Sequence, residues 1–140
     1  MLEKIIFKKE IYAIILRKKY KSSGIEFFTP NKFSQQLAYM KRPKGYIIQP
    51  HIHKKVKKEI KFTQEVLFIR SGKVKVEFFN NKKLFIKSKI LNEGDIVLLS
   101  KGGHGFKILK ESEIIEVKQG PYDPKSDKIR FNPQKKKIKK

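Results

Sequence analysis

The second half of the chain alternates between apolar and polar residues in short runs. The clearest run, Lys73-Val-Lys-Val-Glu-Phe, has an apolar side chain at every second position. Because successive side chains of a strand point to opposite faces, this pattern predicts a strand with one face on a core and the other in solvent. Six such strands, rich in valine, isoleucine and phenylalanine, are expected over residues 65–70, 73–79, 84–90, 96–99, 106–109 and 114–118.

Turn-forming residues separate these runs. They occur at Ser71-Gly72, Asn80-Asn81, Gly94 and Gly102-Gly103. Many short strands at nearly regular spacing are typical of a sandwich or a closed barrel. The expected fold class is therefore all-β, with a single domain.

The remaining segments give weaker signals. Residues 1–20 fit a strand or a short helix, and we favour a strand that adds to the sheet edge or to a partner subunit. Residues 33–40 and 46–53 are strand-like, and the lysine-rich residues 54–61 are expected to form a loop over the barrel mouth. We expect an N-terminal extension, a barrel and a C-terminal extension with a disordered basic tail, because like charges repel. The expected bounds are 1–23, 24–122 and 123–140.

The composition excludes some kinds of chemistry and favours some kinds of partner. With 140 residues the chain can bury one core, and the absence of cysteine excludes disulfides, thiolate metal sites and cysteine catalysis. Lysine and arginine total 35 against 13 acidic residues, a net charge of +22 that would attract anionic ligands, although A/T-rich codon usage is an alternative explanation. No nucleic-acid-binding signature is visible, so no specific nucleic-acid partner is expected. No apolar run is long enough for a signal peptide or a membrane span, so we expect a cytoplasmic protein.

The three histidines are the candidate chemistry. His51 and His53 would share one face of the predicted strand 46–53, about 6.5 Å apart, and could converge on one ion. Glu65 and His104 could complete the set. Three imidazoles and one carboxylate suit a divalent ion such as zinc, iron, manganese or nickel, and they leave positions open for water or substrate.

Ordinary packing is the alternative for each of these residues. The histidines can be core or surface residues, and Glu65 can be a solvated acid at a strand end, with Gln64 or Glu59 closer to the site. If Glu65, Leu67 and Ile69 share the inward face, the carboxylate lies among apolar side chains and needs a partner such as a metal. That geometry favours Glu65 as a ligand.

The spacing of these residues resembles the two motifs of the cupin family. In the first motif a glycine, five residues, His-x-His, a spacer, a glutamate and six residues precede a second glycine. In the second motif a glycine and a short strand precede a histidine, here Gly94 and His104. The resemblance covers roughly residues 24 to 120 and implies a jelly-roll β-barrel and a homodimer formed through the first strand. The residues that match the first motif are Gly45, His51, His53, Glu65 and Gly72.

The end of the domain resembles cupin-type nucleotide-sugar ketoisomerases. Those enzymes close on a similar Tyr-Asp, Asp, Ile-Arg pattern, which begins here at Tyr122, and they carry a His-x-His-Lys element that matches His51, His53 and Lys54. The resemblance implies that histidine and tyrosine act as acid and base without a metal. The whole domain is still more similar to small single-domain cupins associated with bacterial surface-polysaccharide genes.

These observations lead to one hypothesis with two alternatives. We expect a metal-binding cupin that acts on or binds a small anionic carbohydrate-type metabolite, with a nucleotide-sugar as the candidate, in surface-polysaccharide synthesis. A metal-independent isomerase or epimerase that uses His51, His53 and Tyr122 is the first alternative, and a non-enzymatic sugar- or metal-binding module is the second. A solvated loop and simple packing are the alternatives for the substrate-binding candidates, which are Lys54, Lys55, Tyr46 and Lys118.

Overall fold

A computed structural model describes residues 1–133 of the chain. These residues form strands, turns and irregular segments; they contain no helix, and so none that could cross a membrane. Contacts divide the chain into two units. The first, the sheet unit, joins residues 1–20 to the chain from Phe62 onward, and the second, the hairpin unit, comprises residues 21–61. The expected all-β class is confirmed for the described residues, whereas the predicted disordered tail lies at 135–140, outside them.

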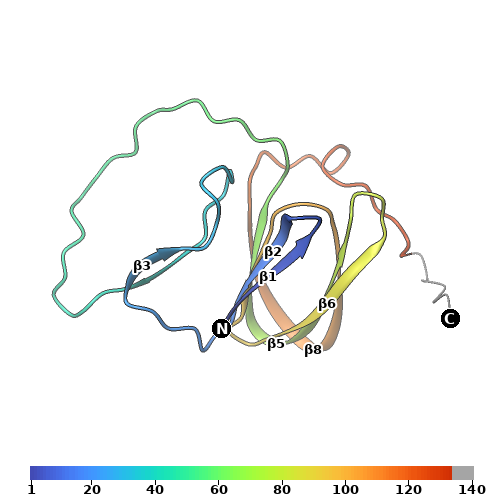
Figure 1. Ribbon diagram of the computed structural model, residues 1–140, viewed down its shortest axis with the longest axis horizontal. Helices are drawn as coiled ribbons and strands as arrows, with labels where there is room; N and C mark the ends of the chain where they lie inside the picture. Colours follow the sequence, from blue (N-terminus) through green and yellow to red (C-terminus); the bar gives the residue numbers. More distant parts are fainter. Residues whose placement is uncertain (134–140) are drawn as a thin grey trace. The chain divides into compact units, whose positions relative to one another are not determined.

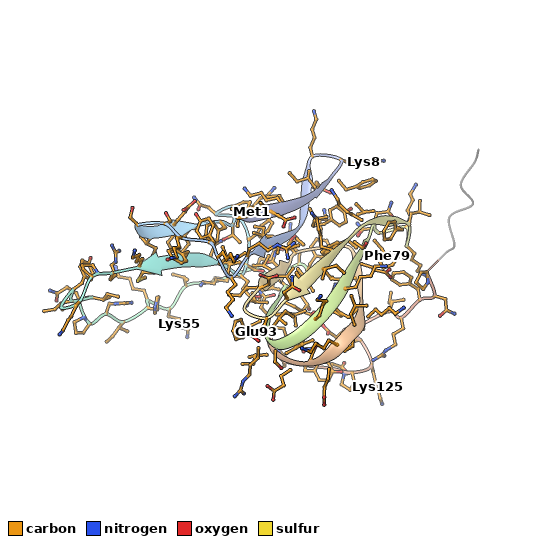
Figure 2. The ribbon with its side chains drawn as sticks, turned by 90° about the horizontal axis from the view of Figure 1, so that it is seen from below. Met1, Lys8, Lys55, Phe79, Glu93 and Lys125 are labelled. Carbon is orange, nitrogen blue, oxygen red and sulfur yellow. The ribbon has the colours of Figure 1, made fainter. Side chains whose placement is uncertain are left out.

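The sheet unit is one strongly curled, six-stranded antiparallel sheet (Figure 1). Its path runs β1-β2-β7-β5-β6, and β8 pairs with the other edge of β5. The strands are β1 (Leu2–Phe7), β2 (Glu10–Leu16), β5 (Glu65–Phe79), β6 (Phe85–Asn92), β7 (Ile96–Leu99) and β8 (Gly103–Lys118). The expectation of a strand in residues 1–20 is confirmed by the β1–β2 hairpin, whose tip carries Lys8 (Figure 2).

The curl follows from how β5 is paired. Its first residue, Glu65, pairs with Leu99, and its last, Phe79, pairs with Gly103. Leu99 and Gly103 are four residues apart, so they are separated by at most about 14 Å. A straight strand of 15 residues would span about 46 Å. β5 must therefore bend back on itself, and both of its ends come close to the β7–β8 connection.

Gly72 lies at the bend of β5. Its φ is +90°, and a Cβ atom there would lie 2.2 Å from the carbonyl oxygen of Glu111 on β8, so only glycine fits. The register with β8 shifts on both sides of this position. The chain turn expected at Ser71-Gly72 is therefore wrong, because this segment is a bulge inside a continuous strand. Residues 106–109 and 114–118 are likewise parts of the single strand β8.

The core lies against the curled sheet. Leu67 and Ile69 are buried before the bend in β5, and Val74 and Val76 after it, so the inward positions change from odd to even numbers at the bulge. The alternation predicted from Lys73 onward is confirmed. The buried core cluster comprises Ile5, Tyr12, Ala13, Ile15, Leu67, Ile69, Val74, Val76, Phe78, Leu91, Val97 and Leu99.

A partly buried ion-pair network, centred on the buried carboxylate of Asp95, connects three parts of the sheet. Asp95, 4% exposed, accepts hydrogen bonds from Arg17 Nη1 at 2.8 Å and from the backbone N–H groups of Lys18 and Asn92 at 3.0 and 2.9 Å. Arg17 Nε donates to Glu3 Oε1 at 2.7 Å. This network joins β1, the end of β2 and the turn between β6 and β7.

The hairpin unit holds two short antiparallel strands, β3 (Gly24–Phe27) and β4 (Ala38–Lys41). The connection between them is fixed by Thr29, whose Oγ1 donates to Gln36 Oε1 at 2.6 Å and accepts from the N–H of Leu37 at 3.2 Å. Residues 42–61 form no strand. The prediction of a strand at 46–53 is therefore wrong. Of the segment predicted as a strand at 33–40, only the end forms one. The absence of a strand at 54–61 agrees with the loop expected there.

Candidate functional site

Glu65 and His104 lie in contact at the end of the sheet unit. Glu65 opens β5 and His104 is the second residue of β8, and Glu65 Oε2 lies 3.2 Å from His104 Nε2. Because β5 curls, the start of β8, which pairs with the end of β5, comes back to the start of β5. Glu65 is 6% exposed, and the inward face that it shares with Leu67 and Ile69 is confirmed by their burial.

The surroundings keep Glu65 ionised. The hydrogen bond from His104 lowers the pKa of Glu65 and outweighs burial, which raises it; the charges of His104, Lys128 and Lys118 lower it further. A carboxylate only accepts hydrogen bonds, so Nε2 of His104 carries a proton in this contact. In the neutral imidazole the other nitrogen, Nδ1, is then unprotonated and can accept a proton.

Lys118 and Tyr122 lie beside this pair. Lys118 is the cross-strand partner of Glu65, its Nζ lies 3.5 Å from Glu116 Oε1, and the same Nζ lies 4.6 Å from the centroid of the Tyr122 ring. Desolvation lowers the pKa of Lys118, but the charges of Glu116 and Glu65 outweigh it and raise this pKa above its ordinary value. Lys118 is therefore a cation held next to an aromatic face. We call Glu65, His104, Lys118 and Tyr122 the rim site.

The other five predicted site residues belong to the hairpin unit. His51 and His53 contact each other, with ring centroids 5.2 Å apart and an interplanar angle of 76°, and His51 Nδ1 lies 2.9 Å from the carbonyl oxygen of Gln49. Both rings are exposed, and strand alternation does not set their direction because this segment is not a strand. Lys54 and Lys55 are exposed as well (Lys55 is labelled in Figure 2), and the guanidinium carbon of Arg42 lies 4.6 Å from the centroid of the Tyr46 ring.

The predicted metal ligands thus form two pairs, one in each unit. Each pair offers donor atoms that zinc, iron, manganese and nickel accept, namely imidazole nitrogen and carboxylate oxygen. Neither unit by itself, over residues 1–133, holds a group of three or more histidine or acidic side chains able to bind a metal. The four-residue metal site stays a prediction.

Sequence reasoning missed Lys128, whose charge acts on Glu65. Nothing in the spacing signals it, because Lys128 lies beyond the last strand. Asp127 Oδ1 accepts a hydrogen bond from Thr63 Oγ1 at 3.0 Å, and this contact fixes the neighbouring residue close to the start of β5. A lysine in a basic segment cannot be distinguished from its many neighbours until such a tertiary contact is known.

Comparisons with protein-family models, with curated proteins and with solved structures found no match. The cupin resemblance therefore rests on the motif residues alone. Of these, Glu65 and His104 come together in the sheet unit, and the glycines at 45, 72 and 94 all have positive φ.

Proposed function

We propose that the rim site is an acid–base centre for a small anionic carbohydrate-type metabolite, with a nucleotide-sugar as the candidate, in surface-polysaccharide synthesis. The contact between buried Glu65 and His104 carries the proposal. A carboxylate that holds one imidazole nitrogen fixes the tautomer and orientation of the ring and leaves the other nitrogen free to accept a proton.

The reaction class that fits this pair is isomerisation or epimerisation of a keto-sugar. His104 Nδ1 would remove a proton from the carbon next to the carbonyl, and the electron pair would move to the carbonyl oxygen as an enediolate. In an isomerisation the proton would return to the former carbonyl carbon, while the proton of the adjacent hydroxyl passes to the former carbonyl oxygen, so that the hydroxyl carbon becomes the new carbonyl. In an epimerisation the proton would return to the same carbon from the opposite face, and neither route needs a redox partner. Imidazole suits this role near neutral pH, and a positioned acid or base contributes about 10²–10⁴-fold in rate. Tyr122 is the candidate second proton donor, and Lys118 the cation facing the anionic ligand.

Two histidine substitutions test the assignment. We expect His104→Gln to reduce conversion of a keto-sugar nucleotide, followed by NMR, by at least about 10²-fold. His51→Gln is the matched control, because it makes the same change in the hairpin unit. A large loss for His51→Gln and none for His104→Gln would instead support the role of His51 and His53 that the isomerase resemblance implies.

Metal binding is the second candidate function. Its support is that both predicted pairs, Glu65 with His104 and His51 with His53, already bring two suitable side chains together. All four residues would hold one ion, which would polarise a substrate oxygen or activate a water molecule. Elemental analysis of protein purified without an affinity tag should then find about one equivalent of metal, lost in the double variant His51→Ala/His53→Ala.

The outcomes separate the candidates. Metal-free protein that converts a keto-sugar nucleotide supports the acid–base centre and contradicts the metal site. Saturable binding of nucleotide-sugars without turnover supports a non-enzymatic binding module.

A homodimer through β1 is also proposed, since β1 is the terminal strand of the sheet path, and sedimentation at several concentrations tests it.

A further inference from the structure

After β8 the chain folds back along the sheet unit. The backbone N–H of Gln64 donates to Gln119 Oε1 at 3.1 Å, Thr63 Oγ1 donates to Asp127 Oδ1 at 3.0 Å, and the Phe131 ring packs edge-on against Phe79 with centroids 5.3 Å apart. These contacts join residues 119–131 first to the start of β5 and then to its end, a course that Figure 1 also shows. We call residues 119–131 the strap.

The strap brings a lysine to the rim site. Lys128 follows Asp127, which is bound to Thr63 two residues before Glu65, and its charge acts on the Glu65 carboxylate. Among the residues described, the ammonium group of Lys128 forms neither a hydrogen bond nor a salt bridge with a side chain. Lys118, the cross-strand partner of Glu65 on β8, acts on the same carboxylate through its charge. The charges of two lysines from different segments thus act on one buried acid, and the Asp127–Thr63 contact anchors Lys128 near the start of β5, where it is exposed to an anionic ligand.

Phe131 fixes the far end of the strap. A Cβ atom at Gly103 would lie 2.9 Å from the Phe131 ring, so the aromatic side chain occupies the space left by this glycine. Lys83 Nζ lies 5.9 Å from the centroid of the same ring. Since Phe131 is three residues from Lys128, the packing of its ring restricts the position of the backbone at Lys128.

We propose that the strap is an anion clamp: Lys128, with Lys118, binds the phosphate end of a phosphorylated ligand beside Glu65 and His104, and Phe131 positions Lys128. This inference rests on the proposed function for the identity of the ligand but not for the binding itself. Lysine binds phosphate as a point charge, so the position of its ammonium group decides which anion it reaches.

The binding of inorganic pyrophosphate to the full-length protein, measured by calorimetry, tests the clamp. We expect Lys128→Gln to weaken binding about tenfold, the effect of one charged contact. Lys125→Gln is the control: Lys125, labelled in Figure 2, is an exposed lysine of the same strap, and the change removes the same charge. It should weaken binding less than twofold. Equal losses in both variants would mean that pyrophosphate responds only to the overall charge, and no loss in either would mean that Lys128 does not bind it. Either result would contradict the clamp.

Two further variants test the role of Phe131. Phe131→Ala should weaken pyrophosphate binding about as much as Lys128→Gln and should speed hydrogen exchange in the strap but not in β5. Gly103→Ala should act in the same way by displacing the ring. The double variant Phe131→Ala/Lys128→Gln should lose no more affinity than either single variant, because both act through one contact. Faster exchange with unchanged affinity would contradict the positioning role.

The clamp and the proposed reaction can fail separately. Pyrophosphate binding that depends on Lys128, in a protein with no turnover, would contradict the acid–base centre and leave the clamp in place. Turnover that depends on His104 but not on Lys128 would contradict the clamp and leave the acid–base centre in place.

Discussion

At the scale of single residues, the charge of Glu65 is set by its neighbours. His104 donates to it, Lys118 and Lys128 act on it from two segments, and these effects together outweigh its burial. A buried carboxylate without such partners would take up a proton instead. The pair is therefore a site where the protonation state of one side chain determines the hydrogen bonding of the other.

The lowered pKa of Glu65 predicts a specific response to acid. A carboxyl group whose pKa is lower in the folded state contributes stability that is present above its ordinary value of 4.5 and is lost as the pH falls through the folded-state value. We expect the free energy of unfolding, from urea titrations between pH 6 and about pH 3, to fall more steeply for the native sequence than for Glu65→Gln. Other acids titrate equally in both proteins and cancel. Parallel curves would show that Glu65 is not stabilised in its charged form.

At the scale of elements, β5 and its bend create the rim site. A straight strand would keep Glu65 and the start of β8 far apart. Alternation predicted which residues of β5 are buried, but it did not show that residues 71 and 72 are a bulge, because a Ser-Gly pair fits a turn and a bulge equally well. At 46–53 the sequence pattern gave a wrong prediction. Its apolar residues suggested a strand, but in the structure this segment pairs with no other strand.

The bend can be tested at Gly72. Gly72→Ala should destabilise the protein by roughly 2 kcal/mol or more, because it adds a Cβ atom where φ is +90° and the Glu111 carbonyl is 2.2 Å away. Gly45→Ala is the matched control, since φ is +81° there but no atom lies within 4 Å. It should cost about 1 kcal/mol, from backbone strain alone. Equal costs in thermal or urea unfolding would indicate that close packing against β8 is not what fixes the bend.

The network around Asp95 connects the elements that carry the sheet. Asp95→Ala removes one of the acceptors of Arg17 and the acceptor of two backbone N–H groups, and we expect a loss of about 3 kcal/mol in the free energy of unfolding. Glu93→Ala removes an acid two residues away (Glu93 is labelled in Figure 2) whose ion pair with Lys18 is exposed. Exposed ion pairs contribute about 0–1 kcal/mol to the free energy of unfolding, so Glu93→Ala should cost no more than that. A similar small loss for Asp95→Ala would contradict the structural role of the network.

At the scale of the whole molecule, the sequence predicted an all-β protein whose three histidines and Glu65 form the functional site. The fold class and the inward face of Glu65 followed from alternation, which is a local property. The contact of Glu65 with His104 was expected only as part of a four-residue metal site. Lys128 and Phe131 could not be predicted, because their roles depend on how the chain returns after β8. The net charge of +22 attracts anions to the whole surface, so only matched substitutions can assign an anion to one place.

The ¹⁵N NMR spectrum of the three imidazole rings tests the central claim most directly. Three histidines give few signals, and single substitutions to glutamine assign them. We predict that the neutral form of His104 carries its proton on Nε2, and that Glu65→Gln shifts the His104 signals while those of His51 and His53 stay unchanged. If the His104 signals do not respond to Glu65→Gln, the two side chains do not form the pair on which the proposed acid–base centre depends.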